Sequence, residues 1–145
     1  MADIQSLRFV VLETPYDQWE NPIAREMFGR MALLKLNGYR KEYPYGVLPL
    51  DATDYVSTHL LICTEEPGGP LKPIAGYKSL TLQRCYIHNL KFPLLNYMSE
   101  STAPLHASAV KHILERHQHL GNQLAYNGSW TVDPDIRSDR TFVSQ

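Results

Sequence analysis

The chain has 145 residues and a net charge of −1 at pH 7; 43% of its residues are hydrophobic and 20% charged, a balance typical of one globular domain with its own core. The near-neutral charge argues against a nucleic-acid partner, and no apolar run reaches the roughly 20 residues of a membrane-spanning helix. The N-terminus has no secretory signal and the two cysteines fit no metal or redox spacing, so we expect a single cytoplasmic domain over residues 1–145 with no bound metal.

The first half of the chain predicts a strand, a helix and a hairpin. A short, apolar, β-branched run at residues 7–12 is typical of a strand. Asn21 and Pro22 form a helix start, after which apolar residues recur at helical spacing until Asn37-Gly38, a helix-ending pair. An aromatic, proline-containing loop spans residues 39–53. Strands at 55–64 and 74–82, joined by a turn rich in glycine and proline, then form an antiparallel hairpin.

The second half predicts a further helix and a fourth strand. We expect a helix at about 103–120 whose core stripe comprises Leu105, Ala109, Ile113 and Leu114. We expect a strand at about 123–132 on which alternate residues share one face: Leu124, Tyr126, Gly128, Trp130 and Val132. The predicted helix carries His106, His112, His117 and His119, but no two of them are four residues apart, so a solvated helix is favoured over a metal site.

Four stretches and the ending Val132-x-Pro134-x-x-Arg137 carry a family resemblance. The stretches are Arg25 to Arg30 on the first helix, Asp51-x-x-Asp54 before the second strand, Gly76 to Leu80 on the third, and Phe92 to Leu95. With the order of elements, they resemble the first half of a GNAT-type N-acyltransferase, in particular the branch of acyl-homoserine-lactone (autoinducer) synthases and N-acyl amino acid synthases. The resemblance covers nearly the whole chain. It implies an α+β fold with a mixed, mainly antiparallel sheet flanked by helices, ending after the fourth strand with most of the cofactor-binding half absent.

The resemblance also implies a reaction and a set of site residues. An acyl group would pass from a CoA or acyl-carrier-protein thioester to a small amine, with Asp51 and Asp54 as catalytic acids that orient the amine or form ion pairs shaping the site. Val132 and Arg137 would contact the co-substrate. The implied substrate-binding residues are Arg25, Phe28, Arg30, Lys78, Phe92, Tyr126, Ser129 and Trp130.

The residues by themselves leave structural alternatives open for these positions. Acidic residues also favour loops and strand starts, so Asp51 and Asp54 need no site role. Lys78 also suits a solvated strand edge, and large aromatic residues such as Trp130 also fill ordinary cores.

Departures from the family pattern lead to two expectations and a rival hypothesis. The stretch Arg137 to Phe142 holds none of the glycines that let a backbone approach a pyrophosphate, so we expect acyl-CoA to bind at millimolar level or not at all, no better than about −4 kcal/mol. Asn127 and Trp130 stand where the family has Glu and Arg. The strand at 123–132 would be left partly uncovered, so we expect self-association or partner docking through it. The rival hypothesis is a non-catalytic half-domain that acts as a binding or assembly module, or a fragment of a longer enzyme.

Overall fold

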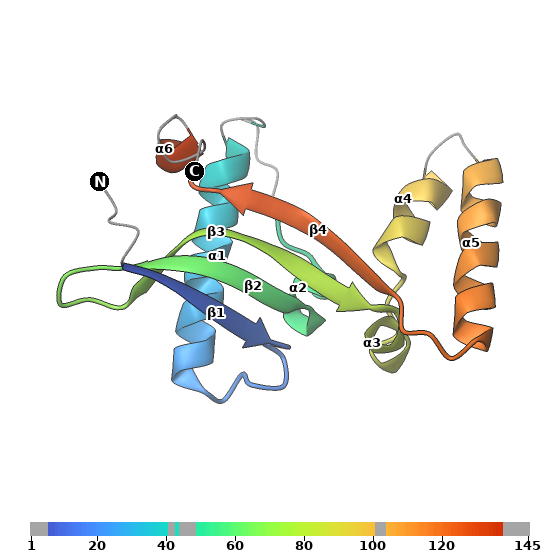
Figure 1. The fold of residues 1–145 in the computed structure, drawn as a ribbon, viewed down its shortest axis with the longest axis horizontal. Helices are drawn as coiled ribbons and strands as arrows, with labels where there is room; N and C mark the ends of the chain where they lie inside the picture. Colours follow the sequence, from blue (N-terminus) through green and yellow to red (C-terminus); the bar gives the residue numbers. More distant parts are fainter. Residues whose placement is uncertain (1–5, 41–42, 44–48, 101–103, 138–145) are drawn as a thin grey trace. The chain divides into compact units, whose positions relative to one another are not determined.

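The computed structural model describes residues 6–40, 43, 49–100 and 104–137. The fold is α+β, with a four-stranded antiparallel sheet in the order β1-β2-β3-β4 (Figure 1). The strands are β1 (Leu7–Glu13), β2 (Thr58–Glu65), β3 (Leu71–Thr81) and β4 (Ala125–Val132); the helices are α1 (Pro22–Arg40), α2 (Ala52–Val56), α3 (Leu82–Ile87), α4 (Pro93–Glu100), α5 (Pro104–His119) and α6 (Pro134–Arg137).

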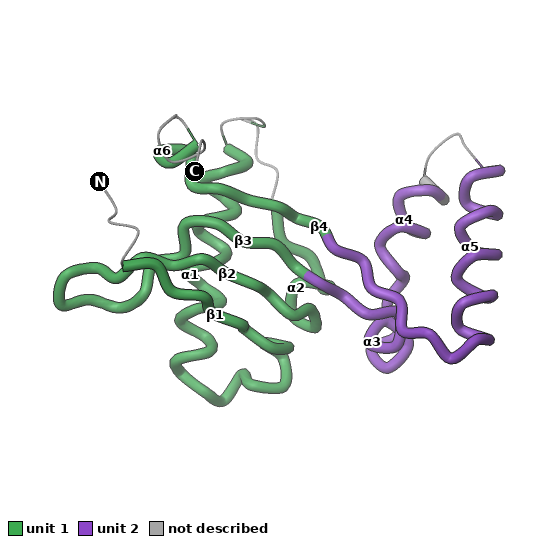
Figure 2. The backbone as a smooth tube through the Cα atoms, viewed as in Figure 1, with its two compact units in different colours: residues 1–78, 128–145 green, residues 79–127 purple. Residues whose placement is uncertain are grey.

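The chain divides into two compact units (Figure 2). Unit 1 comprises residues 1–78 and 128–145, and unit 2 comprises residues 79–127. Strands β3 and β4 each contribute residues to both units. The single domain expected from the sequence stays a prediction.

The inner face of the unit 1 sheet packs against α1. Asn21 caps this helix, its side-chain oxygen accepting a hydrogen bond from the Ile23 amide at 3.0 Å, and Pro22 takes the first helical position. The apolar stripe of α1 then meets the inward residues of β1 and β2 in a core of Leu12, Ala24, Phe28, Met31, Leu61 and Cys63.

Helix α1 runs past the predicted stop at Gly38 and ends at Arg40. The glycine serves a close approach instead, because a Cβ atom at Gly38 would lie 2.8 Å from the Cγ2 atom of Thr131 on β4. The glycine that predicted a helix end is therefore explained by the close packing of α1 against β4.

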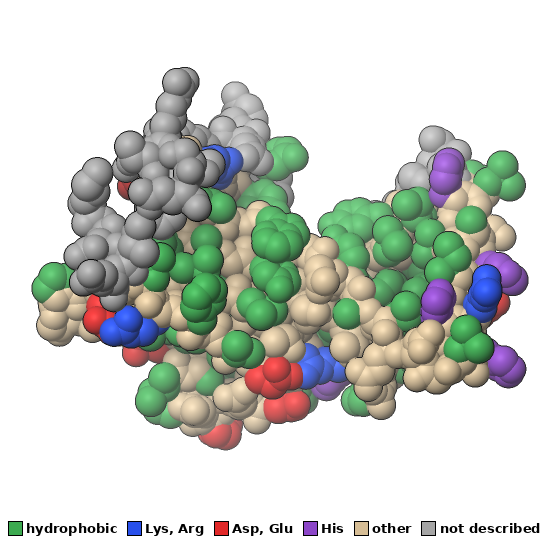
Figure 3. Space-filling view, viewed as in Figure 1, with side chains coloured by type: hydrophobic (Ala, Val, Ile, Leu, Met, Phe, Trp, Pro, Cys, Tyr) green, Lys and Arg blue, Asp and Glu red, His purple; other side chains and the backbone are tan. Residues whose placement is uncertain are grey.

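The outer face of the same sheet keeps apolar side chains in solvent. Phe9 pairs with Ile62 and Val11 with Leu60 across β1 and β2, and Phe9 and Val11 are 84% and 61% exposed. Hydrophobic side chains gather over the strands on this face (Figure 3). We call this surface, with Phe9, Val11 and Trp130 as its most exposed members, the outer face.

The second strand begins later than predicted. Residues 52–56 form α2 and β2 starts at Thr58, so the expected strand from residue 55 is wrong at its start. Asp51 nucleates the helix as its N-cap. Strand β2 then alternates between buried and half-buried residues.

The alternation predicted for β4 holds only as far as Gly128. Ser129 has a φ of 55°, a left-handed backbone conformation that interrupts the pleat. Beyond it the phase shifts by one residue, so Thr131 is buried while Trp130 and Val132 are exposed. The predicted single face is therefore wrong for its last two members.

Unit 2 contains three helices among its described residues. Residues 86–100 contain the end of α3 and all of α4, with Phe92 buried. Helix α5 packs against α4 and buries Leu114, but Leu105, Ala109 and Ile113 are exposed. The predicted core stripe of α5 is thus wrong for three of its four residues, because one partner helix covers only a narrow face.

Candidate functional site

The two predicted acids are held by the start of α2. The Asp51 carboxylate accepts from the Thr53 amide at 2.8 Å, and the Asp54 carboxylate accepts from the Asp51 amide at 2.9 Å. This reciprocal pair is a capping box, which satisfies two backbone donors at once. The spacing that the resemblance assigned to a site therefore also has a local structural cause.

Asp54 lies at the centre of a buried charge cluster. Its Oδ1 atom accepts from Lys35 of α1 and lies 3.2 Å from the Nζ atom of Lys78 on β3. Lys78 also lies 3.7 Å from Asp51 Oδ1 and donates to the Thr53 hydroxyl at 2.7 Å. The side chains of Lys35, Asp54 and Lys78 are at most 5% exposed, so each buried charge depends on its partners.

Lys78 is buried and pairs with both acids, so the alternative of a solvated edge lysine is wrong. Lys35 was not predicted. With Lys35, Lys78, Asp51 and Asp54 all ionised, the cluster carries two positive and two negative charges and is neutral as a whole.

The surroundings shift the pKa values of two members of the cluster. Burial lowers the pKa of Lys35, although the charge of Asp54 and its hydrogen bond oppose this. Partial burial by itself would raise the pKa of Asp51, but the Thr53 hydrogen bonds and the charge of Lys78 outweigh it and hold that pKa below its usual value. Asp51 is therefore ionised at neutral pH, with a side chain 69% exposed.

His59 on β2 is a member of the cluster that sequence reasoning missed. Burial, opposed by a hydrogen bond to the Asp54 carbonyl and reinforced by the charges of Lys35 and Lys78, lowers the pKa of His59 to about 4. Its Nε2 atom lies 2.6 Å from that carbonyl oxygen, which can only accept, so Nε2 carries the proton of a neutral ring. His59 lies two residues before Leu61 and four before Cys63, so it points to the same buried side of β2. This alternation could have predicted its burial from the sequence.

A small cavity connects this cluster with the irregular point of β4. It has a volume of about 10 Å³, the size of a single water molecule, and lies between α1 and strands β2 to β4. Lys35, His59, Ser129 and Thr131 contribute to its wall. The charge cluster therefore reaches the strand where the backbone departs from the pleat.

A larger hollow of about 250 Å³ lies at the end of β4. Trp130, Val132 and Arg137 line it together with the end of α1, and Thr131 lines both this hollow and the small cavity. The Nη2 atom of Arg137 lies 3.4 Å from the Gly38 carbonyl oxygen and 3.5 Å from that of Val132. Three residues predicted for substrate or co-substrate contacts thus converge on one concave surface.

The sheet separates Trp130 from the acids. Tyr77 and Lys78 are successive residues of β3 and point to opposite faces. Trp130 stacks on Tyr77, with ring centroids 4.1 Å apart, whereas Lys78 pairs with Asp51 and Asp54. Trp130 therefore lies on the opposite face of β3 from Lys78 and the two acids.

The remaining predicted residues have separate environments. Phe28 is buried in the core, and its ring contacts those of Tyr55 and His59. Arg25 is exposed, and Arg30 pairs with Glu26 at 3.1 Å on the surface of α1. Phe92 and Tyr126 contact each other within unit 2, with ring centroids 6.3 Å apart.

Some of the expectations concern residues that the structure does not describe, and others concern a metal site or a membrane-spanning helix. Positions 138–142 of the predicted pyrophosphate stretch and residues 41–42 and 44–48 of the aromatic loop at 39–53 lie outside the described residues. Among the described residues, no three His, Cys, Asp or Glu side chains form a metal-binding group, and no helix is long and apolar enough to cross a bilayer.

Comparisons of the chain with protein-family models, with curated proteins and with solved structures find no match.

Proposed function

We propose that the chain is a GNAT-like N-acyltransferase that passes an acyl group from a CoA or carrier-protein thioester to a small amine. The observation that carries the proposal is the hollow at the end of β4, on which Trp130, Val132 and Arg137 converge. The order β1-α1-α2-β2-β3, with β4 beside β3 in an antiparallel sheet, supports it as well.

The lining of the hollow suits a thioester co-substrate. The Arg137 guanidinium presents planar N–H donors of the kind that bind phosphate or carboxylate groups. Trp130 and Tyr39 offer aromatic surface to an acyl or pantetheine chain. In the reaction, the amine nitrogen attacks the thioester carbonyl carbon, the C–N bond forms, the C–S bond breaks, and the thiolate takes up the proton that the amine loses.

The charge cluster supports a division of roles between the acids. Asp54 is 1% exposed and engaged by both lysines, so we assign it to positioning α2 and β3. Asp51 is exposed and ionised, but the sheet separates it from Trp130 and the hollow, so we assign it to capping α2 and to pairing with Lys78.

The test is an acyl-transfer assay at millimolar donor concentration. Acetyl-CoA, longer acyl-CoA thioesters and an acyl carrier protein are each offered with a panel of small amines, and thiol release and acylated amine are measured together. Arg137→Ala and Trp130→Ala should each lower the rate at least about tenfold, while the exposed, distant Arg8→Ala should not. Thiol release that never exceeds the buffer rate with any donor would refute the proposal.

The second candidate is a binding or assembly module. The observation that favours it is the outer face, where Phe9 and Trp130 are 84% and 68% exposed, beside β4 at the end of the sheet order. Its self-associating form requires a dimer or larger species, which sedimentation at high micromolar concentration tests. A monomer at that concentration, together with measured acyl transfer, would exclude that form.

A further inference from the structure

Unit 2 contains a second hollow, independent of the site in unit 1. It has a volume of about 370 Å³, within the range of small-molecule sites. All the residues that line it belong to 79–127, and none of them takes part in the proposed acyl transfer.

Local structure fixes the walls of this hollow. Thr81 caps α3, its hydroxyl accepting from the Arg84 amide at 3.2 Å, and the Leu82 amide donates to the Leu124 carbonyl at 2.9 Å. Gly121, with a φ of 73°, ends α5 in the left-handed conformation that glycine adopts without strain. The chain therefore turns back, so that the end of α5 and the residues before β4 face the first turn of α3.

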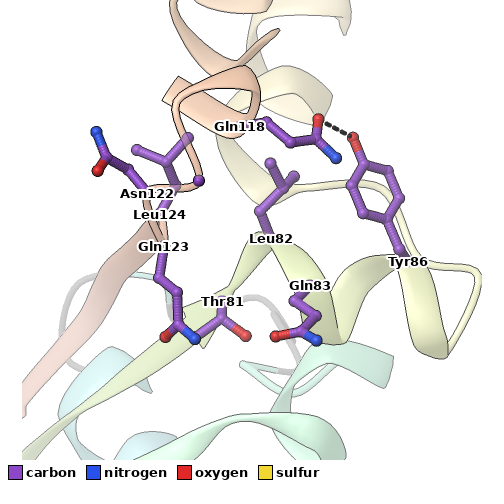
Figure 4. A pocket seen from close by; sticks show the side chains of 9 residues that line it. Thr81, Leu82, Gln83, Tyr86, Gln118, Asn122, Gln123 and Leu124 are labelled. Carbon is purple, nitrogen blue, oxygen red and sulfur yellow. Dashed lines mark hydrogen bonds between the residues drawn. The ribbon is translucent and has the colours of Figure 1, made fainter. Parts of the chain in front are cut away.

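Uncharged hydrogen-bonding groups surround an apolar floor. Gln118 and Tyr86 lie on one side of Leu82, with Thr81, Gln83 and Gln123 on the other (Figure 4). The Tyr86 hydroxyl lies 3.5 Å from Gln118 Oε1, a long contact that a ligand can replace. Of the described residues that line the hollow, none carries a charge at neutral pH.

This lining selects a class of ligand. Each carboxamide offers two N–H donors and an acceptor oxygen, and each hydroxyl both donates and accepts. Such groups complement neighbouring hydroxyls, which also donate and accept. The exposed ring of Tyr86 and the side chains of Leu82 and Leu124 match the C–H faces of a saturated ring. A charged ligand would meet no counter-ion.

We infer that this hollow binds an uncharged, hydroxyl-rich ring, that is, a pyranose unit of a carbohydrate. Gln83, Gln118 and Gln123 hold its hydroxyls, and Tyr86 covers one face of the ring.

The test is a titration of the full chain with methyl pyranosides, followed by the side-chain amide resonances of its glutamines in NMR. At least one pyranoside should shift the resonances of Gln83, Gln118 or Gln123 with saturation at millimolar concentration, which corresponds to about 1 mM or somewhat weaker binding. A deoxy analogue that lacks one bonded hydroxyl should bind at least about tenfold more weakly, because it leaves a carboxamide unpaired.

Variants at exposed positions test the site without threatening the fold. Gln118→Glu keeps the shape but replaces two donors by a charge, and Tyr86→Ala removes the ring; each should weaken binding at least about tenfold. Tyr86→Phe keeps the ring and should cost only about threefold. His119→Ala, on the same helix but outside the hollow, is the matched control and should not change the affinity.

Two results would overturn the inference. One is the absence of saturable shifts with every pyranoside, including the case in which adenosine or a dipeptide amide binds instead. The other is pyranoside binding that Gln118→Glu and Tyr86→Ala leave unchanged. Neither result bears on acyl transfer, which depends on residues of unit 1.

Discussion

Each face of the unit 1 sheet holds side chains of an unusual kind, the inner face beside its apolar core and the outer face in solvent. The inner face, under α1, buries Lys35, Asp54 and Lys78, whereas the outer face leaves Phe9 and Trp130 in solvent. Buried charges are tolerated only when paired, and exposed apolar patches usually mark interfaces. On the inner face, the buried lysines and aspartate stabilise the fold only because their charges are paired. The outer face is the one available for contacts with other molecules.

Removing the carboxylate that pairs with the buried lysines on the inner face should have the largest effect on the free energy of unfolding. Asp54→Asn leaves two buried lysines without their carboxylate, so we expect a loss of about 3–5 kcal/mol in the free energy of unfolding. Urea titration measures it. Asp51→Asn is the matched control, because it removes a carboxylate that is 69% exposed while asparagine caps a helix as well as aspartate, so the cost should be no more than about 1 kcal/mol. Equal losses in the two variants would contradict the central place of Asp54.

The buried histidine should make the inner face sensitive to pH. His59 has a pKa of about 4 in the folded chain against an ordinary value of 6.5, so between these values the unfolded chain binds more protons. Its contribution to stability is complete above pH 6.5 and is lost as the pH falls towards 4, on the order of 3 kcal/mol in all.

Thermal melts at a series of pH values between 7 and about 4 measure this slope, together with that of His59→Gln, which should be flatter. Asp51, with its lowered pKa, loses its contribution only at lower pH, as its carboxylate takes up a proton. If the two chains lose stability in parallel through this window, His59 is not the group responsible.

The contact of α1 with β4 should be sensitive to a single methyl group. Gly38→Ala places a Cβ atom 2.8 Å from Thr131 Cγ2, and we expect a loss of about 1–3 kcal/mol. Thr131→Ser removes that methyl group and should recover most of the loss in the double variant. Gly29→Ala, on the same helix with nothing within 4 Å, should instead stabilise by about 0.5–1 kcal/mol. Chemical denaturation of the four chains gives the comparison, and a neutral Gly38→Ala would show that α1 and β4 are not in close contact.

The outer face should respond least in stability and most in association. Phe9→Ser changes a side chain that is 84% exposed, so the free energy of unfolding should change by no more than about 0.5 kcal/mol. If the outer face is an interface, the same substitution should abolish self-association in sedimentation experiments. Glu65→Gln, at the margin of the sheet, serves as the control. Self-association that persists in Phe9→Ser would place the interface elsewhere.

Local sequence signals predicted much of the framework. The first strand, the start of α1 at Asn21 and Pro22, and the hairpin of β2 and β3 all follow from periodicity and from cap and turn residues. The same signals misassigned α2, because a capping box and the start of a strand use the same acidic residues. They also assigned Leu105, Ala109 and Ile113 of α5 to the core, whereas all three are exposed among the described residues.

The candidate site was predictable only in part. Asp51, Asp54 and Lys78 were singled out by the family resemblance, whereas the residue types by themselves also suited a loop, a strand start and a strand edge. Lys35 could not be singled out, because a lysine on an amphipathic helix is usually a surface residue. Its partner Asp54 lies 19 positions away in the chain, and only the tertiary structure brings the two together. The phase change at Ser129 left no trace in the alternation of residue types either.

The sequence by itself determined the α+β class, the order of most elements and the chemical types available to each, because these depend on neighbours within a few turns or residues. Only the tertiary structure decided which charges are buried together, why Gly38 must lack a side chain, where β4 changes phase and which apolar residues stay in solvent. Those features depend on contacts between segments far apart in the chain. Burial and pairing, rather than residue type, set the energy of a charge or an apolar group.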